Sequence, residues 1–175
     1  AIRLLEQSRL VKYEIHHGAV VSTPTIEELE DLYKTRLHLE LAGVRQEPTP
    51  EQLEAIHSAY ELLKERSESH APERIVEAEL DLHQSFVDLL GSKRLSASYR
   101  QVCKELVFYF TVLSYTDEEF VYPKESILSR HEGIYRAVCE GDRELAEALL
   151  REHIEQNFIR LKSILAARES EAAEA

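Results

Sequence analysis

The sequence predicts an all-α protein, an antiparallel bundle of about six helices preceded by a short β-ribbon. The 175 residues include five Gly and five Pro, while Glu, Leu, Arg and Ala are abundant, which is typical of helices. Apolar residues recur at helical spacing in six segments that short connections join. An apolar content of 43% is enough for one main core.

The first residues predict the end of a helix followed by a small hairpin. Residues 2–10 have a short helical pattern, and apolar and charged residues then alternate from Val11 to Ile15. A turn at residues 16–18 leads into a second strand that ends at Val21. A winged helix ends in this way, so we expect one unit at residues 1–22 and a helical domain at 23–175. Because the chain begins in mid-pattern and contains no Met, we expect it to be a fragment.

Start and stop signals delimit the six helices. Thr25 and Glu28 form a capping-box pattern, Pro50 and Pro72 stand at first helical positions, and Gly91 ends the third helix. The expected ranges are 26–46, 50–67, 72–90, 93–114, 123–140 and 143–167, with a polar, frayed tail. The helix at 93–114 is so apolar that we expect it either at the centre of the bundle or in a subunit interface.

Charge and composition exclude several classes of function. A net charge of −12 opposes binding of this stretch to nucleic acid, so DNA contacts need a local patch or another part of the protein. No apolar run is long enough for a membrane span, and we expect a cytoplasmic protein. Cys103 and Cys139 lack a CxxC spacing and are expected to be buried thiols. The sequence has no Gly-rich phosphate loop and no Ser-His-Asp spacing.

A cluster of possible metal ligands follows from helical geometry. Glu79 and His83 are four residues apart on the apolar face of one helix, so they point inward together. His131 lies ten residues before Gly141, and His153 lies eleven residues after Asp142. At about 1.5 Å per residue both imidazoles lie roughly 15 Å from the turn, side by side on adjacent antiparallel helices.

Three imidazoles and one carboxylate fit a divalent transition metal, with Zn²⁺ as the first candidate and Ni²⁺, Mn²⁺ or Fe²⁺ as alternatives. The competing interpretation is that each inward His is a hydrogen-bonded core residue; we favour the metal for the four together. His57 falls on an inward stripe and is interpreted as core or pocket lining. His38 and His70 are expected at the surface or in a loop, and His16 and His17 at the tip of the ribbon.

Arg36 is the second unusual inward residue, because it continues the apolar face of Leu32 and Tyr33 and has Glu40 one turn later. A buried Arg needs a partner. Two interpretations remain open: an internal pair with Glu40, or a guanidinium clamp for a small carboxylate that also contacts the metal.

These residues resemble the effector domain, called FCD, of the FadR-like branch of the GntR family of bacterial transcription regulators. That family has an Asp or Glu four residues before a His and two later His, as in Glu79, His83, His131 and His153. The segments EAELDLHQSFVDLLGSKRL, HEGIYRAVCEGDRELAEALLREH and TIEELEDLYKTRLHLE are similar to family helices, and the last places Arg36 at the characteristic Arg. AIRLLEQSRLVKYEIHHGAVVS resembles the end of the winged-helix head. The sequence departs from the family at Glu79, Leu82 and Ser92, where Asp, Phe and Asn are commoner.

The resemblance implies a homodimeric DNA-binding regulator. A small organic acid would bind beside the metal and change the fit of the dimer to an operator. Arg36, Tyr33 and His57 are the expected effector-binding residues. In the intact protein, Arg3, His16, His17 and Gly18 would contact DNA.

Two other functions use the same ligands. A helical-bundle metalloenzyme would convert a substrate at a His₃-Glu metal site, and a direct metal sensor would respond to the ion itself. We do not expect an enzyme, because the sequence offers no clear general base beyond the four ligands.

Overall fold

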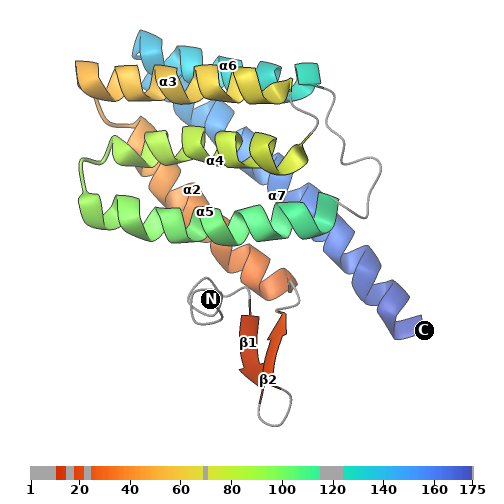
Figure 1. Ribbon diagram of the computed structural model, residues 1–175. Helices are drawn as coiled ribbons and strands as arrows, with labels where there is room; N and C mark the ends of the chain where they lie inside the picture. Colours follow the sequence, from red (N-terminus) through yellow and green to blue (C-terminus); the bar gives the residue numbers. More distant parts are fainter. Residues whose placement is uncertain (1–10, 15–17, 22–24, 69–70, 115–123, 175) are drawn as a thin grey trace.

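The computed structural model describes residues 11–14, 18–21, 25–68, 71–114 and 124–174. Within these residues the chain forms two strands and six helices, labelled as in Figure 1. They are β1 (Val11–Glu14), β2 (Gly18–Val21), α2 (Ile26–Val44), α3 (Pro50–Ser67), α4 (Pro72–Asp88), α5 (Lys93–Ser114), α6 (Lys124–Glu140) and α7 (Arg143–Glu174). The all-α fold class and the six helices are confirmed.

The two strands form the predicted ribbon. They pair antiparallel, with Val11 opposite Val21 and Glu14 opposite Gly18. Gly18 has a φ of +77°, a conformation that suits glycine at the end of a tight turn. In Figure 1 the ribbon extends away from the bundle at the beginning of α2.

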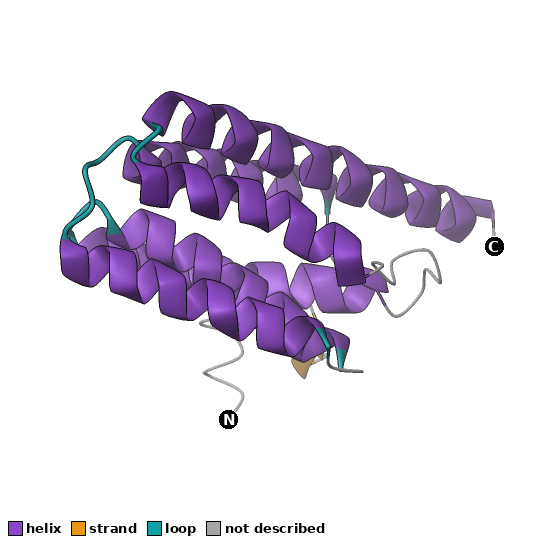
Figure 2. Ribbon diagram, turned by 90° about the horizontal axis from the view of Figure 1, so that it is seen from above, coloured by secondary structure: helices purple, strands orange, loops and turns teal. Residues whose placement is uncertain are grey.

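Helix α4 occupies the centre of the bundle. It packs against α2, α3 and α5, and every side chain from Leu82 to Val87 is buried. Figure 1 shows α3, α4 and α5 running side by side, with α2 and α7 crossing behind them at an angle, and Figure 2 shows the same layering from above. The two helices that carry the ends of the domain therefore cross the central helix, while α6 packs on α3 and α7.

Local signals begin and end the helices as expected. The Thr25 hydroxyl accepts a hydrogen bond from the Glu28 backbone amide, and Thr49 forms a full capping box with Gln52. Gly91 and Gly141 have φ of +64° and +77° where α4 and α6 end. These boundaries fix the lengths of α4 and α6, and so the depth of the side chains that they carry.

One glycine brings α2 unusually close to α4. A Cβ atom on Gly43 would lie 2.0 Å from the carbonyl oxygen of Phe86, so only a residue without a side chain permits this approach. The contact holds the inner face of α2, which carries Arg36 and Glu40, against the helix that carries Glu79 and His83.

Two expectations, about the C-terminal tail and about the cysteines, are wrong, and one about α5 is narrowed. Helix α7 continues to Glu174 where a frayed tail was expected, because its last residues are strong helix formers without Gly or Pro. Helix α4, and not the more apolar α5, lies at the centre of the bundle, so the other place expected for α5, a subunit interface, stays a prediction. Cys139 is exposed and Cys103 is partly buried, so neither is the fully buried thiol expected.

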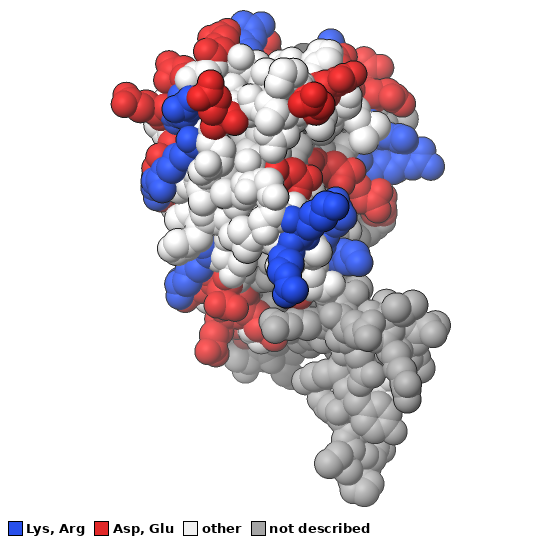
Figure 3. All heavy atoms as spheres, turned by 90° about the vertical axis from the view of Figure 1, so that its left-hand side faces the viewer, with Lys and Arg blue, Asp and Glu red and all other residues white. Residues whose placement is uncertain are grey.

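The surface of the helical domain carries both signs of charge. On the face drawn in Figure 3, acidic and basic side chains surround an uncharged centre and form no continuous basic patch. None of the helices in the described residues is long and apolar enough to cross a membrane.

Candidate metal centre

The four predicted ligands meet inside the bundle. Glu79 and His83 come from α4, His131 from α6 and His153 from α7, and all four are buried. One ligand atom from each lies within 4.8 Å of the others. The depth calculated from the α6–α7 turn is correct, since the His131 and His153 ring centres are 4.5 Å apart.

The distances show atoms directed at a common point. His83 Nε2 lies 3.3 Å from His131 Nε2. Glu79 Oε1 lies 3.6 Å from His131 Nε2 and 3.8 Å from His153 Nε2. Donor atoms bound to one transition metal at about 2.0–2.2 Å are separated by similar distances.

Outer hydrogen bonds orient two of the imidazoles. His83 Nδ1 lies 2.5 Å from Glu40 Oε2, and His131 Nδ1 lies 2.7 Å from the carbonyl oxygen of Ile127. Each acceptor requires a proton on Nδ1, which leaves the Nε2 lone pair free to face the centre. Two lone pairs 3.3 Å apart cannot hydrogen-bond to each other, and a cation between them satisfies both.

His153 is held differently. Its Nε2 lies 3.1 Å from the Nδ2 atom of Asn157, one turn later in α7. Its Nδ1 is buried and has no hydrogen-bond partner among the described residues. The orientation of His153 therefore depends on Asn157, and not on an acceptor behind the ring.

Burial keeps the imidazoles neutral. It lowers the pKa of His131, and it lowers those of His83 and His153 well below the ordinary value. A neutral imidazole is the form that binds metals. Three neutral nitrogens and a carboxylate thus fit a divalent transition metal, and the facing lone pairs give a physical reason to place one here.

Arg36 lies beside this cluster and is fully buried. Its Nε donates to Glu40 Oε1 at 2.7 Å, so the internal pair exists. Its Nη1 and Nη2 atoms, also buried, have no hydrogen-bond partner among the described residues. Although burial opposes the charge, Glu40 and the nearby Tyr99 hold the pKa of Arg36 well above its usual value. A charged guanidinium with two free nitrogens is suited to a carboxylate.

Glu40 connects the guanidinium to the imidazoles. It accepts hydrogen bonds from Arg36 and His83, and a very short one from the Tyr99 hydroxyl in α5. Burial raises the pKa of Glu40, although Arg36 and Tyr99 oppose that effect.

A groove lies between α2 and α7 and includes Tyr33, the neighbour of Arg36. It has a volume of about 180 Å³ and is lined by Tyr33, Leu37, Ile154 and Phe158 with charged residues around them. The Tyr33 ring lies 5.3 Å from the Phe158 ring and 5.7 Å from the Arg36 guanidinium carbon. Tyr33 therefore lies between the groove and the buried charge.

The other predicted site residues lie elsewhere. His57 is exposed and its Nδ1 contacts the Tyr135 hydroxyl at 2.8 Å, so the expectation that it faces inward is wrong. The reason is that only a narrow stripe of α3 is buried, at Ile56, Tyr60, Leu63 and Ser67, and His57 lies outside it. His38 is exposed as expected. Arg3, His16, His17 and His70 lie outside the described residues, and Gly18 begins β2.

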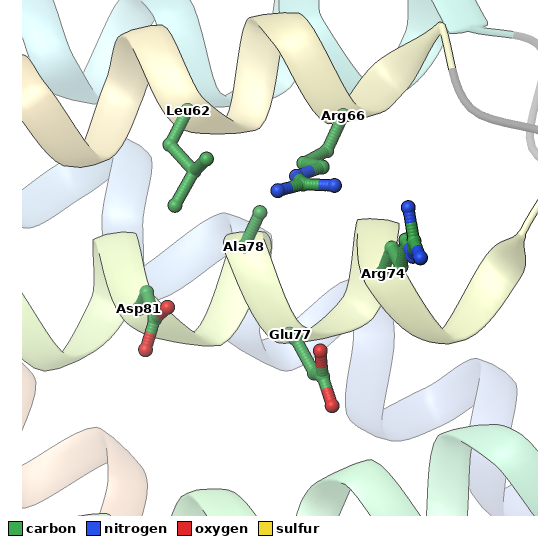
Figure 4. Close-up of a pocket in the computed structure, with 6 residues that line it drawn as sticks. All are labelled: Leu62, Arg66, Arg74, Glu77, Ala78 and Asp81. Atoms are coloured by element: carbon green, nitrogen blue, oxygen red, sulfur yellow. The ribbon is translucent and has the colours of Figure 1, made fainter.

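A second groove lies on the surface between α3 and α4, away from the buried ligands. Figure 4 shows Arg66 and Arg74 directed into the space between the two helices, with Glu77 and Asp81 on the other side of α4. Its volume is about 410 Å³. Mixed charges and an open shape distinguish it from the apolar interior around the four ligands.

Sequence reasoning missed three contributors. Asn157 shares the inner face with His153 by its spacing of four residues, a signal that was available. Glu40 was recognised as a partner for Arg36 but not for His83. Tyr99 gave no signal, because its contact with Glu40 joins residues 59 positions apart.

The family model, a curated relative and the solved structures that resemble this chain all point to one family. The FCD domain family matches residues 31–156. YdhC, an HTH-type transcriptional regulator of Bacillus subtilis (strain 168), is 24% identical over 169 residues, which cover 94% of this chain and 74% of YdhC. A solved GntR-type transcriptional regulator from Rhodococcus sp. RHA1 has a TM-score of 0.76 and 29% identity, covering 91% of this chain and 75% of that one. E. coli McbR/YncC shares the fold, with a TM-score of 0.75, 18% identity, and coverage of 93% and 77%. The chain belongs to the FCD-domain family of GntR-type, FadR-like transcription regulators.

Proposed function

We propose that this chain is the effector-binding and dimerisation part of a cytoplasmic DNA-binding regulator that senses a small organic acid at a metal-containing centre. Glu79, His83, His131 and His153 hold a divalent transition metal. Arg36 binds the carboxylate of the acid. The observation that carries the proposal is the convergence of four buried ligand atoms within 4.8 Å of one another.

The metal part rests on polar groups that the protein alone leaves unsatisfied. Burying imidazoles and a carboxylate in an apolar bundle is unfavourable unless they have partners. The fixed protons on His83 Nδ1 and His131 Nδ1 leave two facing acceptors 3.3 Å apart. A bound ion supplies the positive charge that compensates these groups and attracts an anionic ligand.

The acid part rests on Arg36. Two buried donor atoms without partners among the described residues match the two oxygens of one carboxylate. Tyr33 forms one wall, because its ring contacts the guanidinium on one side and the α2–α7 groove on the other. The groove is apolar at its base, so it suits a small acid with a short hydrocarbon part.

Effector binding is coupled to DNA binding through the helices that carry the site residues. The centre draws residues from α4, α6 and α7, and Arg36 and Glu40 come from α2. Helix α2 begins directly beyond the ribbon, which we assign with the rest of residues 1–22 to the end of a winged-helix DNA-binding domain. A ligand that shifts α2 against α4 therefore acts on the adjoining DNA-binding part, with a coupling free energy of about 1–3 kcal/mol.

In this proposal Arg3, His16, His17 and Gly18 contact operator DNA. The regulator is a homodimer, as is usual for proteins that bind paired half-sites. The helical domain, residues 23–175, carries the dimer contacts and the effector.

The test is a titration of small organic acids into the intact regulator, metal-loaded or chelator-treated, with operator binding as the readout. We expect release or capture of operator DNA only when metal and acid are both present. The variant Arg36→Leu should bind metal normally and lose the response to the acid. A full response to metal alone would instead support a metal sensor, and chemical turnover of the acid would support an enzyme.

A further inference from the structure

Asn157 is a buried polar residue that the proposed function does not use. It is 3% exposed and follows His153 by one turn on the inner face of α7. Its amide lies 3.1 Å from His153 Nε2, the same atom that lies 3.8 Å from Glu79 Oε1. The amide therefore contacts the nitrogen that faces the centre.

The distance is that of two neighbouring ligands on one ion. Two donors bound at about 2.1 Å and at right angles, as in octahedral coordination, are about 3.0 Å apart. The end of the Asn157 side chain lies 3.1 Å from His153 Nε2. Turning the amide by half a revolution exchanges Nδ2 with Oδ1, which places an oxygen donor where the nitrogen lies.

The chemistry of the amide changes with the ion. Nδ2 is a donor, so it hydrogen-bonds to the lone pair of His153 Nε2 when no cation competes for that lone pair. When an ion binds the same lone pair, Oδ1 becomes the favourable end, because an amide oxygen binds cations and an amide N–H is repelled by them. The imidazoles of His83 and His131 are held from behind instead, where Glu40 and the Ile127 carbonyl lie against their Nδ1 atoms.

We propose that Asn157 is a fifth, oxygen-donating ligand that makes the centre prefer five- or six-coordinate ions such as Ni²⁺, Mn²⁺ and Fe²⁺ over four-coordinate Zn²⁺. The inference rests on the proposed metal centre and adds its selectivity. Four protein donors fill a tetrahedral shell, whereas three nitrogens and two oxygens exceed it. A sixth position then remains for the carboxylate of the acid.

The experiment compares the complete chain with Asn157→Leu, which keeps the branched shape at Cγ and has no donor, and with Asn157→Asp, which keeps the oxygen. Each protein is loaded with Co²⁺, whose visible absorption is weak in five- or six-coordinate sites and several-fold stronger in tetrahedral ones. Competition between Mn²⁺ and Zn²⁺ gives the selectivity. Circular dichroism checks that each variant folds, and Asn157→Val replaces the leucine variant if that one does not.

We expect weak absorption from the unchanged chain and from Asn157→Asp, and strong tetrahedral absorption from Asn157→Leu. The Mn²⁺ to Zn²⁺ affinity ratio should fall at least about tenfold in Asn157→Leu. A residue that only positions His153 would weaken both ions together and leave the spectrum unchanged, and that result would overturn the proposal. If the unchanged chain takes up no Co²⁺, Mn²⁺ or Zn²⁺, the metal centre itself is wrong, which is a different outcome from an unchanged ratio.

Discussion

Glu40 is the residue through which the buried charges are held in place. It accepts hydrogen bonds from its own helix, from α4 and from α5, through Arg36, His83 and Tyr99. One oxygen receives Arg36 and Tyr99, while the other receives His83. A single carboxylate thus fixes both the orientation of the His83 ring and the position of the Arg36 guanidinium.

Removing this carboxylate should destabilise the protein more than removing the whole ion pair. In Glu40→Gln, Arg36 keeps its charge without its anionic partner, which costs about 3–5 kcal/mol in the free energy of unfolding. The double variant Arg36→Met with Glu40→Met buries no unpaired charge and should recover at least half of that loss. Urea unfolding of chelator-treated protein at neutral pH measures the loss of stability in Glu40→Gln and in the double variant. A double variant less stable than Glu40→Gln would show that the pair itself stabilises the fold.

At the scale of elements, the site depends on how closely four helices, α2, α4, α6 and α7, approach one another. Gly43 lets α2 lie against the backbone of α4 at Phe86. The α6–α7 hairpin then aligns His131 with His153, because both helices leave the turn at Gly141 and rise equally along the bundle. The ligands therefore meet at one depth without any irregular backbone in the helices that carry them.

Gly43→Ala should separate α2 from α4. The new Cβ would meet the Phe86 carbonyl oxygen at 2.0 Å, so the backbones must move, at a cost of about 1–3 kcal/mol in stability. Gly133→Ala is the matched control, because its Cβ meets only the Leu149 side chain, at 3.3 Å, and alanine favours a helix by about 0.5–1 kcal/mol. We expect the control to be neutral or stabilised in thermal unfolding. Equal losses in the two variants would contradict the close approach as the cause.

The end of α2 is tied to α7 by a pair that should give a pH-dependent stability. Hydrogen bonds from Arg45 and Arg151 lower the pKa of Glu147 from 4.5 to about 2. A carboxyl with a lower pKa in the folded state stabilises that state above about pH 4.5, and the contribution disappears as the pH falls towards 2. The groups are largely exposed, so the effect is small.

Urea unfolding of the unchanged chain and of Glu147→Gln between pH 6 and 3 measures how much the Glu147 carboxylate contributes to the free energy of unfolding at each pH. The unchanged chain should be the more stable at pH 6, and the difference should shrink below pH 4.5. Glu152→Gln, which removes a carboxylate bonded to the neutral Gln156 and leaves the Arg45–Glu147 pair intact, is the matched control. A Glu147→Gln difference that stays constant over this range would contradict the assignment.

At the scale of the whole molecule, local patterns predicted most of the architecture. Periodicity and caps set six helices within a few residues of their observed bounds, since those signals act within one turn. The convergence of the four proposed ligands was predictable for the same reason: Glu79 and His83 share a turn, and His131 and His153 lie at nearly equal distances from one short turn. Each inference used distances along a helix and none across the core.

What the sequence could not predict depends on tertiary packing. The packing of α2 against α4 and α5 brings Glu40 to Tyr99, and the narrow buried stripe of α3 leaves His57 exposed. Which side chains of an apolar stripe on α3 are buried can be predicted only when the width of the face that its neighbours cover is known. The helical end of α7 follows composition, and expecting it to fray gave too much weight to its polarity.

The measurement that tests the metal centre most directly is the metal content of the purified chain by elemental analysis, with and without His131→Ala and His153→Ala together. We expect about one transition-metal ion for each unchanged chain and none in the double variant. A control without the two exposed imidazoles of the described residues, His38→Ala with His57→Ala, should retain its ion. The same metal content in all three proteins, or none in the unchanged chain after incubation with the candidate ions, would contradict the assignment.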